Sequence, residues 1–120
     1  MPFRQILNEL LETTEGSLGA MFLDYEGETV ELLTHRNLKS DDLKIVGAYQ
    51  GIFLTQLRRI CQDMFIGDPR RFKIEFEGTK VLSCDLKDGY YVVLLVGHDA
   101  IEGLAWHRLD HCREMLLAEM

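Results

Sequence analysis

Two segments that are apolar at nearly every position constrain the fold more than any other feature of the sequence. Residues 18–23 read LGAMFL and residues 90–96 read YYVVLLV. Successive side chains of a β-strand point to opposite faces, so such strands must be covered on both sides. We therefore expect both segments in the middle of a sheet. Residues 71–77 instead alternate charged residues with Phe and Ile, which predicts an edge strand with one wet face.

Glycine-containing turns separate the strand-like segments. Because hairpin turns of this kind connect antiparallel strands, they predict a meander rather than a parallel sheet. The expected turns are Glu26-Gly27, Glu77-Gly78 and Asp88-Gly89.

Apolar residues at helical spacing predict three helices. The first covers residues 3–15, the second runs from about 40 to 64, and the third follows residue 101. We expect Ser40 to cap the second helix and Asp99 with Glu102 to form a capping box at the third. The predicted fold is one α+β domain over residues 1–120, in the order αββαβββα. Its five-stranded antiparallel sheet carries the long helix on one face and the other two helices on the opposite face.

The long helix has two apolar sides. The side expected to face the sheet consists of Leu43, Val46, Phe53, Leu54, Leu57, Ile60, Cys61 and Met64. A second group lies away from it and consists of Ile45, Ala48, Gly51, Ile52 and Thr55.

Gly47 and Gly51 lie four residues apart in this helix, although each glycine costs roughly 1 kcal/mol relative to alanine. We interpret them as space for the same helix of a second copy, packed across a two-fold axis. The alternative is that they relieve crowding against the protein's own sheet. The predicted edge strand supports self-association, because its charges could pair with those of its own copy, but they could equally protect the edge.

The composition excludes several classes of function. A net charge of −7 and a pI near 5.0 argue against nucleic acid and against an anionic membrane as partners. Neither a signal sequence nor a membrane-spanning segment is recognisable, so we expect a cytoplasmic protein without membrane insertion. Three widely spaced cysteines suggest buried thiols rather than disulfides or a zinc site.

No strong catalytic motif is present. The sequence lacks GxxxxGK[ST], so it does not bind a nucleoside triphosphate in the P-loop manner. His107 and His111 have a spacing that can hold a metal, but no further ligand pattern accompanies them. We therefore expect no metal and no cofactor. One arginine of Arg58-Arg59 or Arg70-Arg71 could act as an arginine finger, although a solvated face is the simpler interpretation.

The sequence resembles the Roadblock, or dynein light-chain, domain family in its short bacterial, MglB-like form, whose architecture is profilin- and longin-like. The resemblance covers nearly the whole chain and rests on the element order and on four segments: GAMFLDYEGETVEL, DLKIVGAYQGIFLTQL, LKDGYYVVLLV and GLAWHRLDHCREML. It implies a homodimer in which the long helices pack together and the third strands join two sheets. It also implies a regulator or scaffold that binds a Ras-like small GTPase and has no active site of its own. The interface positions carried over are Ile45, Ala48, Gly51, Ile52, Thr55, Arg59, Arg71, Lys73 and Glu75.

Two other classes of function remain open at this point. A domain of this size can hold a small molecule between its central strands and a covering helix, which would make the protein a sensor. A thiol-dependent enzyme built on Cys61 or Cys84 with a histidine is the other alternative.

Overall fold

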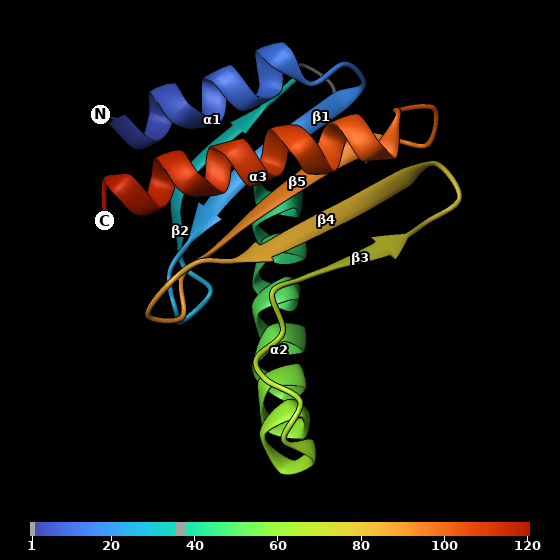
Figure 1. The fold of residues 1–120 in the computed structure, drawn as a ribbon. Coiled ribbons are helices and arrows are strands. Elements are labelled where there is room, and N and C mark those ends of the chain that lie inside the picture. The colour runs from blue at the N-terminus through green and yellow to red at the C-terminus, as the bar shows by residue number, and fades with distance from the viewer. Residues whose placement is uncertain (1, 36–37) are drawn as a thin grey trace.

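A computed structural model describes residues 2–35 and 38–120 of the protein. Its five strands form one antiparallel sheet in the order β2-β1-β5-β4-β3 (Figure 1). The elements are α1 (Pro2–Thr13), β1 (Ser17–Leu23), β2 (Thr29–Thr34), α2 (Ser40–Met64), β3 (Arg71–Glu75), β4 (Thr79–Asp85), β5 (Tyr91–Gly97) and α3 (Glu102–Ala118). The predicted order and fold class are confirmed, and the two apolar segments form the central strands β1 and β5.

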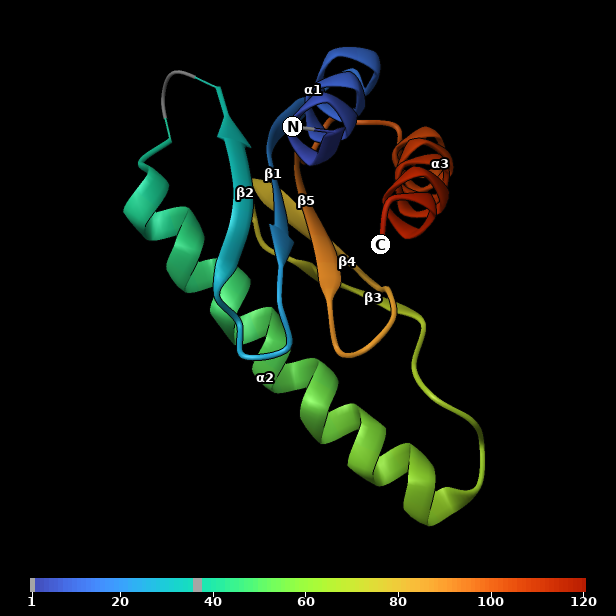
Figure 2. The same cartoon turned by 90° about the vertical axis from the view of Figure 1, so that its left-hand side faces the viewer.

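The sheet is covered on both faces. Helices α1 and α3 lie side by side on one face, whereas α2 lies on the other, as Figure 2 shows from the side. Alternate residues of each central strand enter the two layers, so Phe22 and Val92 pack under α1 and α3 while Met21 and Val93 pack under α2. This arrangement explains why both strands are apolar at nearly every position.

Positive φ angles mark two of the predicted turns. Gly27 has φ 83°, and Asp88 and Gly89 have φ 56° and 83°. The N–H of Tyr90 closes the second turn by donating to the carbonyl of Lys87 at 3.0 Å. Tight hairpin turns require positive φ angles of this kind, and glycine adopts them without steric cost.

The predicted helix caps are wrong. Lys39 is the N-cap of α2 and Ile101 is the N-cap of α3, and neither makes a side-chain capping bond. The carboxylate of Glu102 accepts a bond from Lys73 at 2.7 Å and lies 3.3 Å from Lys80. It therefore binds lysines of β3 and β4 and does not form the predicted capping box.

Helix α2 extends well beyond the sheet. Its C-terminal half projects from the body of the molecule in Figures 1 and 2. Ile60 and Met64, which we expected to face the sheet, are therefore exposed, as is the following Phe65. Among the described residues, no helix combines the length and the apolar character that crossing a membrane requires.

Candidate functional site

The inner face of α2 explains both helix glycines. A Cβ atom on Gly47 would lie 2.9 Å from the side chains of Met21 and Leu23, and one on Gly51 would lie 2.5 Å from the hydroxyl of Tyr91. That hydroxyl donates a hydrogen bond to the carbonyl of Gly47 at 2.7 Å. The close approach therefore comes from the protein's own sheet. Our interpretation of the glycines as space for a second helix is wrong, and the alternative is confirmed.

The opposite side of α2 is nevertheless apolar. Leu43 and Leu54 face the sheet and are buried, whereas a row of large apolar side chains on the other side is about half exposed. We call this row the outer stripe; it consists of Ile45, Tyr49, Ile52 and Ile60, with exposed fractions of 57%, 54%, 50% and 53%. A helix that is apolar on two sides normally has a packing partner on each. The described residues supply a partner only for the inner side.

A cleft of about 330 Å³ lies beside the outer stripe, between α2 and the turn that joins β1 to β2. Tyr25, Glu26 and Gly27 form its turn side. On the helix side, it is lined by five of the six positions predicted for α2: Ala48, Gly51, Ile52, Thr55 and Arg59. The structure thus brings these residues together with the outer stripe. The sequence prediction missed Tyr49, although its spacing of four from Ile45 and three from Ile52 could have identified it.

Aromatic contacts connect the outer face of α2 to the edge strand β3. The rings of Tyr49 and Phe53 lie 6.4 Å apart, and Phe53 meets Phe72 of β3 edge-on at 6.4 Å. Phe76, just after β3, is exposed as well. The apolar surface is therefore continuous from the helix to the sheet edge.

The backbone of β3 is open along this edge, because β4 is its only strand neighbour in the described residues. Phe76 donates to Thr79 O, and Asp85 donates to Arg70 O. Antiparallel bonds recur at every second residue. Arg71, Lys73 and Glu75 are therefore the positions whose N–H and C=O groups point outward.

The side chains of these three residues lie on the α3 side of the sheet, away from the outer stripe. Arg71 lies 3.4 Å from Asp110 and 4.6 Å from the ring centre of Trp106. Lys73 bonds Glu102, and this bond raises the pKa of Lys73 and lowers the pKa of Glu102. The predicted site residues thus form two groups, one on the outer face of α2 and one at the β3 edge.

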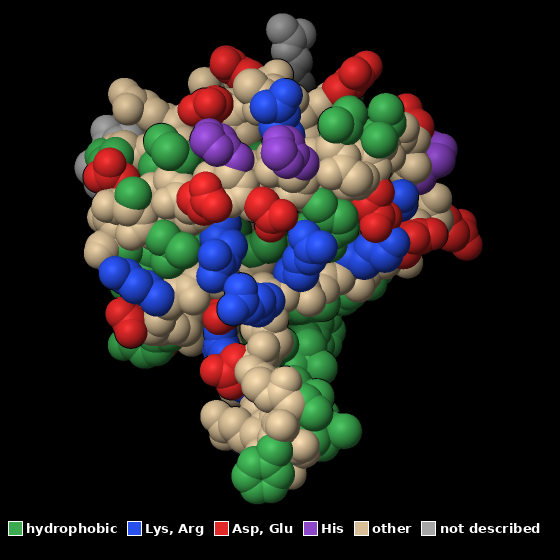
Figure 3. Space-filling view, viewed as in Figure 1, with side chains coloured by type: hydrophobic (Ala, Val, Ile, Leu, Met, Phe, Trp, Pro, Cys, Tyr) green, Lys and Arg blue, Asp and Glu red, His purple; other side chains and the backbone are tan. Residues whose placement is uncertain are grey.

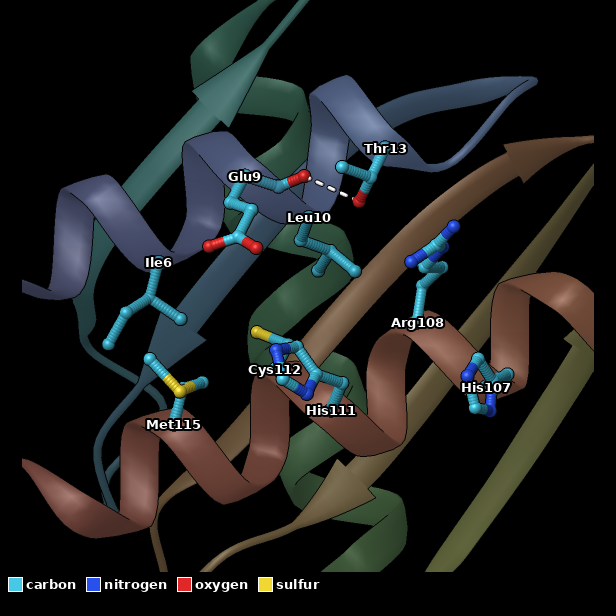
Figure 4. A pocket seen from close by; sticks show the side chains of 9 residues that line it. All are labelled: Ile6, Glu9, Leu10, Thr13, His107, Arg108, His111, Cys112 and Met115. Carbon is cyan, nitrogen blue, oxygen red and sulfur yellow. Dashed lines mark hydrogen bonds between the residues drawn. The ribbon is translucent and has the colours of Figure 1, made fainter.

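The remaining candidates for chemistry find little support. Burial raises the pKa of the Cys84 and Cys112 thiols to about 12, so both are protonated at neutral pH and are poor nucleophiles. His111 lies in a small pocket between α1 and α3, across from Glu9 (Figure 4). Within residues 2–35 and 38–120, no group of three potential metal ligands comes together.

The alternative hypothesis, a small-molecule sensor, placed its pocket between the central strands and the covering helix. Large side chains fill the layer between the central strands and α2, and Met21, Leu23, Leu54 and Tyr91 are almost fully buried there. The cleft beside the outer stripe lies at the edge of this layer.

At the level of sequence, no protein-family model matches the chain, and no curated protein matches it significantly. Solved structures match its fold. A Roadblock/LC7 domain from Streptomyces avermitilis has a TM-score of 0.81 at 15% identity, covering 92% of this chain and 91% of its own. The gliding protein MglB from Thermus thermophilus has a TM-score of 0.86 at 14% identity, covering 98% and 87%. MglC from Myxococcus xanthus has a TM-score of 0.70 at 22% identity and is covered completely, as is this chain.

Proposed function

Because the chain has the fold of the Roadblock domains and exposes an apolar side of its longest helix, we propose that it is a homodimeric regulator or scaffold of a Ras-like small GTPase. The observation that carries the proposal is the outer stripe, whose half-exposed side chains have no partner in the described residues. A second copy is the simplest partner, because a two-fold axis lets the same surface cover itself. An MglB protein of this fold, 15% identical, has been solved in a tetrameric arrangement, which supports self-association.

The length of α2 suits an antiparallel pair. The helix spans Ser40–Met64, so its midpoint is Ile52 in the outer stripe. Two antiparallel copies of the helix that are centred on Ile52 overlap along their full length. The overhanging half of each helix, which the sheet does not cover, then packs against the first half of the other. This arrangement accounts for the exposure of Ile60 and Met64.

The edge strand allows one favourable register with a second β3. A two-fold axis at Lys73 lets all three outward positions form backbone bonds and places Arg71 opposite the partner's Glu75. Each Lys73 then lies opposite the partner's Lys73, but Glu102 already neutralises its charge. An axis at Phe72 would instead place Arg71 opposite the partner's Lys73, and an axis at Ile74 would leave Arg71 without a strand partner. We therefore favour Lys73 as the centre.

The GTPase as partner follows from the Roadblock resemblance. We expect the dimer to act by biasing the conformation of the GTPase switch loops, or to serve only as an adaptor. Two of the four arginines considered as a finger are engaged within the chain, since Arg58 pairs with Asp85 and Arg71 pairs with Asp110. This supports an effect on switch loops more than a donated arginine.

The test combines the protein with a Ras-like GTPase from the same organism. We expect the two to co-elute and GTP turnover to change in proportion to bound protein. The Ile52→Asp variant, which should be monomeric, serves as the control for a requirement for the dimer. No co-elution together with unchanged turnover would remove the GTPase role and leave the dimer unaffected.

A further inference from the structure

Positive charge gathers on one face of a protein whose net charge is −7. Figure 3 shows Lys and Arg side chains in a band across the face that carries α3, over β3 and β4. Within this band is a pocket of about 450 Å³, which we call the arginine pocket; it is lined by Arg70, Arg71, Cys84, Asp110, Arg113 and Glu114. It lies where β3 begins and β4 ends, on the side of the sheet opposite the outer stripe.

Two guanidinium groups of the pocket are held in place. Arg113 donates from Nε to the carbonyl of Asp85 at 2.8 Å, which leaves its two terminal nitrogens for other partners. Arg71 lies over Trp106 and bonds Asp110 through one terminal nitrogen. Groups fixed in this way lose little conformational entropy when they bind a ligand.

The charges of the pocket are not balanced. Asp110 is engaged by Arg71, and Asp85 behind the pocket is engaged by Arg58. Arg70 is exposed and makes no ion pair within the described residues. Glu114 also makes none, and it is the carboxylate at the rim that opposes an incoming anion. Three guanidinium groups and two carboxylates thus line the pocket, which leaves a net charge of +1, with Arg71 and Asp110 already paired with each other.

We propose that the arginine pocket binds carboxylates from an acidic segment of a partner protein. A guanidinium group donates two parallel hydrogen bonds to a carboxylate, so a fixed arginine such as Arg113 recognises an Asp or Glu side chain with defined geometry. A small basic area on an acidic protein also orients an acidic partner as it approaches. The pocket lies apart from the α2 surface but adjoins the β3 edge, and in the proposed dimer Arg71 lies opposite the partner's Glu75. Arg70 and Arg113 are therefore the groups left to bind the acidic segment.

The test is fluorescence anisotropy with a fluorescein-labelled octaglutamate peptide at low ionic strength. We expect saturable binding that weakens with added salt. Arg70→Gln and Arg113→Gln should each raise Kd by about fivefold, as expected for loss of a partly exposed charge-assisted contact. Arg108→Gln is the matched control, because it removes the same charge from α3 outside the pocket and should leave Kd unchanged. Glu114→Gln should lower Kd by about twofold, because it removes the opposing charge.

The Arg70→Gln variant should fold normally, because the exposed Arg70 side chain makes no hydrogen bond within the described residues. Weaker binding by this variant would therefore not result from misfolding. The proposal is wrong if Arg108→Gln weakens binding as much as Arg113→Gln does, because the attraction is then non-specific. Weaker binding by Glu114→Gln would overturn it as well. If octaglutamate fails to bind while inorganic phosphate shifts the arginine Nε resonances in NMR spectra, the pocket takes a small anion and the protein partner is excluded.

Discussion

The inner and outer faces of α2 belong to one helix but have opposite surroundings. On the inner face, the hydroxyl of Tyr91 lies between two glycines, and Leu54 is almost fully buried. On the outer face, Ile45 and Ile52 are about half exposed. The difference shows that the glycines are determined by the protein's own sheet, whereas the isoleucines remain half exposed among the described residues.

Leucine and isoleucine truncations on the two faces should give the largest contrast. Leu54→Ala should lower the free energy of unfolding by about 2–5 kcal/mol, because it leaves a cavity in the core. Ile52→Ala should cost the monomer less than about 1 kcal/mol, since its side chain is half exposed. Urea unfolding at several protein concentrations separates the two effects, because only the Ile52 effect should depend on concentration. Equal, concentration-independent losses would contradict the distinction between the faces.

Alanine at the two kinds of helical glycine should change stability in opposite directions. Gly51→Ala should destabilise by about 1–3 kcal/mol, because its Cβ would overlap Tyr91. Gly103 of α3 is the control, since a Cβ there meets no atom within 4 Å. Gly103→Ala should therefore stabilise by up to about 1 kcal/mol through helix propensity. Thermal unfolding measures both, and a stabilising Gly51→Ala would place the contact with Tyr91 in doubt.

The smallest effect is expected at the β3 edge, where it should appear as a change in the pKa of Glu102. Lys73 bonds Glu102 and is the main cause of its lowered pKa, so Lys73→Met should raise the pKa of Glu102 towards 4.5. The stability from this ion pair is present above about pH 4.5. It is lost as the pH falls through the lowered pKa that Glu102 has in the folded protein. NMR titration of the Glu102 carboxyl measures the shift. An unchanged pKa would mean that Lys80 alone holds the carboxylate.

Sequence patterns predicted the central strands and the edge strand correctly, because strands that are buried on two faces or on one have different patterns of apolar residues. These patterns are present in residues 18–23, 90–96 and 71–77. Contacts between residues distant in sequence were not predictable in this way. Tyr91 lies 40 residues from Gly51, and Lys73 lies 29 residues from Glu102. Neither the contact at Gly51 nor the absence of the capping box could therefore be predicted from neighbouring residues.

The position of the sheet edge was also not predictable. We assigned Ile60 to the side of α2 that faces the sheet, but the structure places it in the outer stripe, and periodicity says nothing about where the sheet ends. The predicted interface positions on α2 lie together on one surface, and their role remains a prediction.

Sedimentation equilibrium at micromolar concentration tests the central claim most directly. We predict a mass of twice 13.9 kDa for the protein and 13.9 kDa for the Ile45→Asp/Ile52→Asp double variant. Leu104→Asp, at an exposed position of α3, should remain dimeric and serves as the control. A 13.9 kDa particle for the unmodified protein, or a double variant that stays dimeric, would contradict the account.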